Sequence, residues 1–490
     1  MLMGIAHSWR AFMDIYDWKK KYSQKPAPQY THFDRRISLK NCFSYITSAN
    51  KISSHGFYPF IHCTIKSRKV KNGKKAKPKT RQIYYAAHLD GWIYRYYAYL
   101  INEAYNNRVK LDGINEVAVA YRTDLRDGNI QLAKRAFDCI RKMQPCYIMI
   151  GDFTSFFDNL DHAYLKAMLC DLLSVNRLPE DFYAVYKNIT HFSYVELEDL
   201  LALRGYKNTR KGRKAFNSYE NERALTPEEF RKNRSLVKSN LNSGHGDARG
   251  YGIPQGSPIS AVLANVYMLE GDKRLQEYVS SQDGFYMRYS DDFIVVLPIS
   301  NIDFSVQYAS IKAILSSIPN LKLESSKTKL FCYKDTVLKN CTDQFIFEGT
   351  SEKNTKNIIE FLGFSFDGEC VRIRDKTISK YYNRLYRKVR TIIKSGGHTR
   401  KGHQISCRNL YEKYSYKGSA VYRKKRAQKT GVPLNEDQKS GNFHDYVSRA
   451  KAVFHDIPTD KVTIGAATRR HMQKIKKQLK TIRKVDNPNC

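Results

Sequence analysis

The sequence contains little that would support a secreted or membrane-embedded protein. Its ten cysteines form no C-x-x-C pair and show no regular spacing, so reduced thiols are the default expectation. No apolar run approaches the ~18 residues that a membrane span needs. The first ten residues lack the apolar core of a signal peptide. We therefore expect a cytoplasmic protein with no membrane partner, although binding at a membrane surface stays open.

Acidic residues are scarce relative to basic ones. The 490 residues include 47 Asp and Glu against 84 Lys and Arg, a net charge of +37. An excess of this size indicates a polyanionic partner. The 35 Tyr and 24 Phe add rings that suit single-stranded nucleic acid, which binds by base stacking and phosphate neutralisation, although most of these rings are expected in the core. The 42% hydrophobic content allows two to four domains or one large multi-lobed fold.

Two adjacent aspartates interrupt an apolar run between residues 285 and 297. The pattern predicts a β-hairpin with Asp291 and Asp292 at its tip. Two like charges crowded at a turn cost free energy unless a cation is bound, so the pair indicates a divalent metal site. A solvated turn is the alternative, because Asp favours turns. The hairpin alone leaves both interpretations open.

A third carboxylate and a glycine-rich turn lie upstream. Asp152 follows the apolar run 146–150, which predicts a buried strand that ends at the carboxylate. A strand-end carboxylate beside a hairpin-tip pair suits two metal ions that activate an attacking 3′-oxygen and stabilise a leaving pyrophosphate. Residues 251–267 predict a turn opening a helix, where Gly256 permits close approach and Gln255 offers an amide. Only the fold could bring these segments together.

In this order, the three blocks resemble the polymerase motifs of reverse transcriptases, most closely the prokaryotic group II intron, retron and stand-alone abortive-infection or defence enzymes. The blocks are Asp152 with Phe157-Asp158, residues 252–260 with 263–265, and residues 289–292. Four further blocks match in order: residues 79–83 and 119–122 as fingers motifs, 327–328 as the fourth palm motif and 361–364 as the primer grip. The resemblance spans roughly residues 79–395.

The resemblance implies an α+β fold of the right-hand polymerase type, with fingers, a ferredoxin-like palm built on an antiparallel sheet, and an α-helical thumb. The expected parts are an N-terminal helical extension (1–31), fingers (32–145), a palm (146–370) with a basic insertion at about 204–250, and a helical thumb with a basic helical C-terminal extension (371–490).

The resemblance also assigns roles to single residues. Asp152, Asp291 and Asp292 would be catalytic and would hold two Mg²⁺ ions, or Mn²⁺, with the Phe153 carbonyl as an extra ligand. The nucleotide-binding set would be Lys79, Arg81, Phe157, Gln255, Gly256 and Lys327. Within that set, the ring of Phe157 would exclude ribonucleotides at the 2′ position, and Lys327 would protonate the pyrophosphate or would be a solvated charge. The primer grip would be Phe361, Leu362 and Gly363.

The implied function is RNA-directed DNA polymerisation. The enzyme would use dNTPs to make a DNA product on an RNA template, expected to be a structured non-coding RNA, in antiphage defence. Ser290 replaces the commoner alanine, a mild steric change that should not harm metal binding. The Asn-Ala-x-x-His and Val-Thr-Gly signatures of retron enzymes are not found, nor is the Cys- or His-rich nuclease tail of mobile intron proteins, which favours a stand-alone defence enzyme by elimination. Template-independent or protein-primed synthesis stays open, as does a maturase-like, RNA-binding splicing cofactor. The template, primer, product sequence and oligomeric state, a homo-oligomer included, are not written in the residues.

Overall fold

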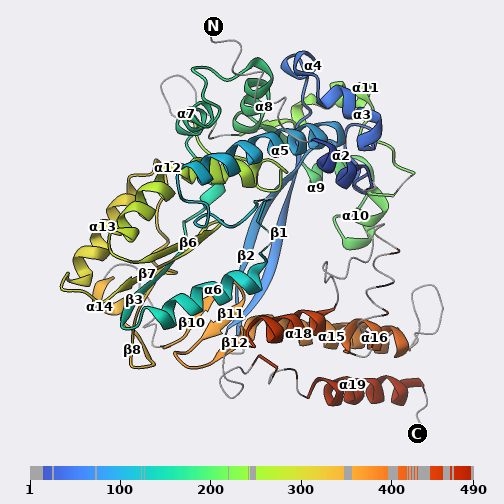
Figure 1. Cartoon of the computed structure of the whole chain (residues 1–490). Coiled ribbons are helices and arrows are strands. Elements are labelled where there is room, and N and C mark those ends of the chain that lie inside the picture. The colour runs from blue at the N-terminus through green and yellow to red at the C-terminus, as the bar shows by residue number, and fades with distance from the viewer. Residues whose placement is uncertain are drawn as a thin grey trace. The chain divides into compact units, whose positions relative to one another are not determined.

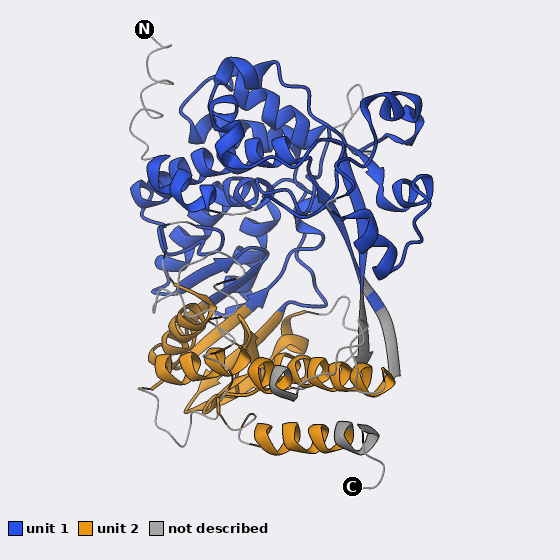
Figure 2. Cartoon of the chain, turned by 90° about the vertical axis from the view of Figure 1, so that its right-hand side faces the viewer, with its two compact units in different colours: residues 1–125, 150–295, 302–328 blue, residues 126–149, 296–301, 329–490 orange. Residues whose placement is uncertain are grey.

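The computed structural model describes two compact units (Figure 2): residues 1–125, 150–295 and 302–328 form unit 1, and residues 126–149, 296–301 and 329–490 form unit 2. Figure 1 shows the elements in chain order. The described residues are 15–24, 27–71, 74–122, 124–125, 127–218, 220–240, 242, 250–346, 356–395, 407–416, 442–455 and 470–486, with isolated residues between 418 and 468. The first part of the predicted N-terminal extension, residues 1–14, lies outside this set.

One sheet of unit 1 has the strand order β2-β1-β4-β5. Its strands are β1 (Phe60–Lys71), β2 (Lys74–Tyr85), β4 (Ser193–Glu196) and β5 (Lys238–Ser239). The two long strands β1 and β2 form an antiparallel hairpin, whereas β4 runs parallel to β1. The sheet therefore combines strands of the predicted fingers with strands from the segment assigned to the palm.

The segment that follows β4 packs on this sheet because its apolar residues share a core with it. Helices α9 (Leu197–Leu203), α10 (Arg210–Phe216) and α11 (Pro227–Lys232) lie between β4 and β5. Leu200, Leu201 and Phe216 are buried together with Phe33 and Ile61. Much of the basic insertion predicted at about 204–250 thus joins the β1–β2 sheet. Residues 241 and 243–249 of the insertion lie outside the described residues.

The helical part of unit 1 centres on two long helices, α5 (His88–Leu111) and α12 (Ser260–Ser280), which pack against each other. Both bury residues on most of their circumference. The remaining helices of this unit are α2 (Ile15–Ser23), α3 (Leu39–Ile46), α4 (Ala49–Ser53), α7 (His162–Leu172), α8 (Glu180–Thr190) and α13 (Phe304–Ser316). Across the described residues, none of the helices is both long and apolar enough to cross a membrane.

A five-stranded sheet has the order β6-β7-β3-β8-β9. Its strands are β3 (Cys146–Gly151), β6 (Phe285–Tyr289), β7 (Asp292–Pro298), β8 (Lys329–Lys334) and β9 (Val337–Asn340). Because β3 is flanked by β7, the end of β3 comes close to the start of β7: a Cβ at Gly151 would lie 2.2 Å from the Phe293 ring. This approach requires glycine immediately before Asp152.

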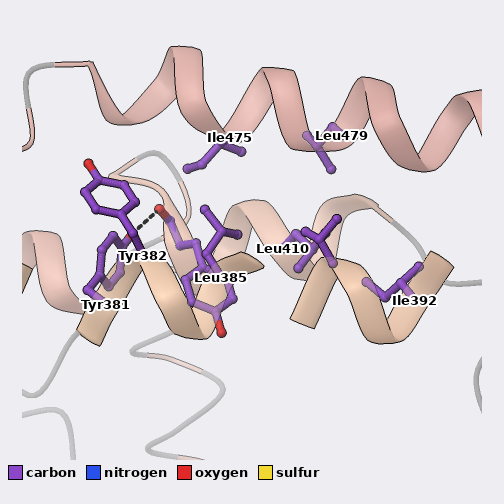
Figure 3. Close-up of a cluster of buried hydrophobic side chains, with 9 residues drawn as sticks. Tyr381, Tyr382, Leu385, Ile392, Leu410, Ile475 and Leu479 are labelled. Atoms are coloured by element: carbon purple, nitrogen blue, oxygen red, sulfur yellow. Dashed lines mark hydrogen bonds between the residues drawn. The ribbon is translucent and has the colours of Figure 1, made fainter. Parts of the chain in front are cut away.

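Unit 2 contains a small sheet and a group of helices. Strands β10 (Ile359–Phe361), β11 (Phe364–Phe366) and β12 (Val371–Ile373) form an antiparallel sheet. The helices are α6 (Asn129–Lys142), α14 (Thr342–Phe345), α15 (Asp375–Lys394), α16 (Cys407–Tyr414), α18 (Phe443–Val453) and α19 (His471–Asp486). Figure 3 shows the apolar stripe of α15 packed against Leu410 of α16 and against Ile475 and Leu479 of α19.

Two buried histidines pack beside this helical core. The rings of His444 and His471 lie 3.9 Å apart between centroids. The Tyr381 hydroxyl donates to the Tyr414 carbonyl and lies 3.0 Å from His444 Nε2, which therefore donates to it. Burial, reinforced by His471, lowers the pKa of His444 to about 4, with Asp445 opposing. His444 is therefore held neutral in the folded chain.

The stability of this helical group is expected to fall as the pH drops from 6.5 towards 4. In that window the unfolded state binds a proton at His444 that the folded state excludes, so the free energy of unfolding decreases with falling pH. The thermal midpoint of the wild type and of His444→Gln, measured between pH 4 and 8, checks this. Below pH 6.5, the thermal midpoint of the glutamine variant should fall less steeply with decreasing pH than that of the wild type. Equal pH dependence of the two midpoints would contradict the prediction.

Candidate active site

The predicted β-hairpin is present, with its tip formed by Ser290 and Asp291 between β6 and β7. Ser290 has a φ of +64°, in the left-handed region. A non-glycine residue there costs about 1–2 kcal/mol, and such strain persists only where the surroundings enforce it. Ser290 is buried, Asp291 is half-buried and Asp292 is exposed. The tip is thus a strained turn that carries Asp291, and Asp292, which was also predicted at the tip, is the first residue of β7.

A buried arginine holds this turn. The Arg288 guanidinium is fully buried and donates to the Ser290 carbonyl over 2.9 Å. It also forms a two-pronged ion pair with Asp272 of α12, at 2.6 and 2.8 Å, and contacts Asn265 Oδ1 at 3.3 Å. Burial disfavours its charge, but Asp272 outweighs burial and raises the pKa of Arg288. A permanent charge deep in unit 1 therefore fixes the backbone of the tip.

Asp152 lies at the end of β3 and is buried. Its carbonyl accepts from the Glu324 N–H over 2.8 Å, while the Thr154 N–H donates to the Lys322 carbonyl over 2.9 Å. These two bonds form an isolated antiparallel β-bridge between Phe153 and Leu323. The Phe153 carbonyl is not one of the acceptors of this bridge. Lys327 Nζ donates to Asp152 Oδ2, and Asp152 Oδ1 is buried without a hydrogen-bond partner.

The structure brings Asp152 and Asp291 together. Burial raises the pKa of Asp152, the nearby Asp291 charge raises it further, and the Lys327 ammonium opposes both. Crowded carboxylates and an unpartnered buried oxygen fit a divalent cation, which prefers oxygen ligands and relieves the repulsion. No three His, Cys, Asp or Glu side chains are grouped as metal ligands anywhere in the described ranges. The full ligand set with Asp292 therefore stays a prediction.

The glycine-rich turn lies between β2 and the 3₁₀ turn Phe156–Asp158. The Gln255 carbonyl accepts from the Tyr84 N–H over 2.8 Å. Gly256 has a φ of +113°, and a Cβ there would lie 2.8 Å from the Tyr84 carbonyl oxygen. The Ile253 N–H donates to the Phe157 carbonyl over 2.9 Å. The fold thus places three predicted nucleotide-binding residues, Phe157, Gln255 and Gly256, around one turn.

Two other predicted nucleotide-binding residues, Lys79 and Arg81, lie on β2, the strand that this turn contacts. Arg81 is exposed. The side chain of Lys79 lies outside the described residues. The sixth member, Lys327, donates to Asp152, with 47% of its side chain exposed.

The predicted primer grip belongs to unit 2. Phe361 ends β10, and Leu362 and Gly363, with φ of +45° and +94°, form the turn into β11. Asn129 Nδ2 donates to the Leu362 carbonyl over 3.0 Å, and the Arg374 N–H donates to the Gly363 carbonyl over 3.0 Å. The turn is therefore a defined, hydrogen-bonded structure, and its role with a primer stays a prediction.

Sequence reasoning missed the residues that support the tip. Arg288 carried a signal, because it is a charged residue within the apolar run 285–297. Asn265 lies in the block 263–265 of the resemblance, which gave it no role at the tip, and Asp272 carried no signal, since its partner lies on another element of the chain. Both belong to α12, which the predicted turn at residues 251–259 precedes.

Residues 213–366 match the family model described as reverse transcriptase (RNA-dependent DNA polymerase). This segment, which is less than half of the chain, resembles a reverse transcriptase domain. It includes the hairpin tip, the glycine-rich turn and Lys327, and it begins after Asp152. A reverse transcriptase domain indicates an enzyme with RNA-directed DNA polymerase activity, and this family generally uses divalent metal ions. Among curated proteins, none matches the chain in sequence.

Solved telomerases show a distant likeness. One, apo telomerase from Candida tropicalis truncated from the C-terminal domain, is 12% identical, with a TM-score of 0.38 over 73% of this chain and 59% of that chain. Another, telomerase from Candida albicans in complex with a TWJ fragment of telomeric RNA, is 14% identical, with a TM-score of 0.33. That match covers 97% of this chain and 64% of the telomerase chain. The chain thus spans about three fifths of the first telomerase, and such scores support no inference about fold or function.

Proposed function

We propose that the chain is a reverse transcriptase that joins dNTPs into DNA on an RNA template at the Asp152–Asp291 site. One observation carries the proposal: the buried Asp152 carboxyl lies beside Asp291, at the tip of a hairpin inside the segment that matches the reverse transcriptase family. The net charge of +37 supports a nucleic-acid partner.

The chemistry follows from the residues at the site. Asp152, Asp291, Asp292 and the Phe153 carbonyl would hold two Mg²⁺ or Mn²⁺ ions. When bound, the ions lower the cost of ionising a 3′-hydroxyl and stabilise charge on the departing pyrophosphate. Burial opposes the charge of Lys327, but Asp152 outweighs it and raises the pKa of Lys327. Lys327 therefore keeps its proton at neutral pH and is suited to neutralise and protonate the pyrophosphate.

The Phe157→Ala variant is expected to accept ribonucleotides more readily. In the proposal, the half-buried ring beside the glycine-rich turn excludes a 2′-hydroxyl. Opening that space should lower the preference for dNTP over NTP by at least about tenfold. The ratio of kcat/KM for dCTP and CTP measures it, with Phe157→Tyr as the variant that keeps the ring. Unchanged discrimination in Phe157→Ala would reject this role.

We also propose the finer architecture and setting. The β2-β1-β4-β5 sheet and the helices around α5 serve as fingers, the aspartate-bearing sheet as a ferredoxin-like palm, and the helices from α15 onward as a thumb with a basic extension. The enzyme is of the prokaryotic, stand-alone defence type, works in the cytoplasm, and copies a structured non-coding RNA. These steps rest on the sequence motifs and the charge.

One experiment tests template and primer together. The protein is purified with its bound RNA and supplied with dNTPs and Mg²⁺, and the product is sequenced. DNA complementary to the RNA supports the proposal. Untemplated sequence, or a 5′ end attached to the protein, would point to the alternative chemistry at the same site. Rescue of intron splicing by the triple variant Asp152→Ala, Asp291→Ala, Asp292→Ala would instead support a maturase-like cofactor.

A further inference from the structure

Tyr121 is an exposed aromatic residue held in a strained conformation beside the hairpin tip. Its φ is +64°, and 47% of the residue is exposed. Its hydroxyl donates to Ser290 Oγ over 3.2 Å, next to Asp291. A bulky side chain in the left-handed region is an outlier that the surroundings must enforce, and such strain clusters at functional sites.

Both neighbours of Tyr121 are anchored, which explains how the strain is maintained. On one side, Asn265 Nδ2 donates to the Ala120 carbonyl over 2.9 Å, and the Val119 N–H donates to the Arg288 carbonyl over 3.0 Å. The segment before Tyr121 is therefore attached to α12 and to β6, the elements that also support the Ser290 turn.

On the other side, the Arg122 guanidinium is fully buried. It donates to Asp124 Oδ2 over 2.7 Å and to Asn115 Oδ1 over 2.6 Å, and its Nε contacts Asn106 Oδ1 at 3.1 Å. With Ala120 and Arg122 both fixed, the backbone at Tyr121 has little freedom. Its ring is therefore presented at a defined place with little entropy left to lose on binding.

A pre-positioned, exposed ring beside the reaction centre of a polymerase suits one kind of ligand. Every nucleobase has a π-face, and stacking on an aromatic side chain is tolerant of sequence. A tyrosine adds contact area at low conformational cost. The side chain is too exposed to serve as core, and its hydroxyl faces the tip rather than the interior.

We propose that Tyr121 stacks on a nucleobase at the reacting end of the bound nucleic acid. The inference rests on the proposed function and adds a specific contact to it. The stacked base can belong to the RNA template, to the 3′ end of the DNA primer or to the incoming dNTP. All three present the same aromatic face to the ring.

The test removes the ring without disturbing the backbone. Tyr121→Asn suits the conformation, since Asn is enriched in the left-handed region, whereas Tyr121→Phe keeps the ring and removes only the bond to Ser290. Tyr183→Ala, at a tyrosine of unit 1 that is 43% exposed, is the matched control. Thermal midpoints verify that each variant is folded.

Binding is measured by fluorescence anisotropy in Mg²⁺-free buffer, with single-stranded RNA and with an RNA template annealed to a DNA primer; the KM for dNTP is measured separately. Tyr121→Asn should weaken at least one of these three by about 5- to 150-fold, the range of stacking one base. The pattern of losses identifies the source of the base. A contact to the template weakens binding of RNA alone as well as of the annealed substrate, and a contact to the primer weakens binding of the annealed substrate only. A contact to the incoming nucleotide raises only the KM for dNTP. Tyr121→Phe and Tyr183→Ala should stay within about twofold of the wild type.

The proposal is overturned if Tyr121→Asn matches the wild type in all three arms. It is also overturned if Tyr121→Phe loses as much as Tyr121→Asn, because the hydroxyl bond to Ser290 would then account for the effect. Failure of the proposed function looks different: the wild type would bind nucleic acid but make no RNA-templated DNA. The two binding arms need no catalysis and still decide the role of Tyr121 in that case.

Discussion

The Asp291→Asn variant is expected to lose dNTP incorporation by more than about 10³-fold, because the site then lacks a carboxylate needed to hold metal ions worth several kcal/mol in the transition state. Asn keeps the shape of the side chain. It also removes the like charge that raises the pKa of Asp152, so the fold should be as stable as the wild type or slightly more stable. Binding of primer–template RNA–DNA should change little.

Primer extension under single-turnover conditions measures the loss, and anisotropy with the same substrate measures binding. Asp283→Asn is the matched control: Asp283 is an exposed aspartate with a φ of +52°, just before β6. It should keep full activity. Activity of Asp291→Asn within tenfold of the wild type would refute its catalytic role, and a parallel loss of binding would mean that the substitution disturbs more than the site.

The Arg288→Met variant is expected to lower the free energy of unfolding by about 3–5 kcal/mol, because it leaves the fully buried Asp272 carboxylate without its charged partner and with the Tyr286 hydroxyl as its remaining donor. Adding Asp272→Leu should restore part of that stability, since two apolar side chains replace the ion pair while the buried Tyr286 hydroxyl loses its acceptor. The polymerase activity should not return together with the stability. The reason is that the Ser290 carbonyl has lost the bond that Arg288 donates to it.

Chemical denaturation compares the free energies of unfolding, and primer extension compares activities, for the single and double variants. Lys232→Met, which breaks an exposed pair with Glu228, is the control and should cost less than about 1 kcal/mol. A double variant that recovers both stability and activity would show that Arg288 is only a structural charge. A single variant as stable as the wild type would contradict the buried-pair account.

Local patterns were sufficient to predict part of the site. The apolar run before Asp152 and the paired aspartates in an apolar hairpin predicted two elements that the structure contains. Alternation and burial are properties of a short segment, so they can be read from the chain itself. The closeness of Asp152 and Asp291 was an inference from a strand-end carboxylate and a hairpin-tip pair, and the structure places them together.

What the sequence could not predict depends on contacts between distant segments. The bond from Lys327 to Asp152 joins residues 175 apart, and the bond from Tyr121 to Ser290 joins residues 169 apart. The pairing of β4 with β1 is a similar case. The four residues of β4 do not indicate which strand they pair with, and the hydrophobic core that this segment shares with Phe33 and Ile61 determines the pairing. Tertiary packing, not local propensity, sets these features.

The most direct measurement of the central claim is extension of a DNA primer on a defined RNA template with Mg²⁺ and dNTPs. The wild type, the triple variant Asp152→Ala, Asp291→Ala, Asp292→Ala and the Asp283→Asn control are compared. The account predicts full-length DNA complementary to the RNA from the wild type and the control, and none from the triple variant, which still binds the substrate. Equal synthesis by the triple variant would contradict it.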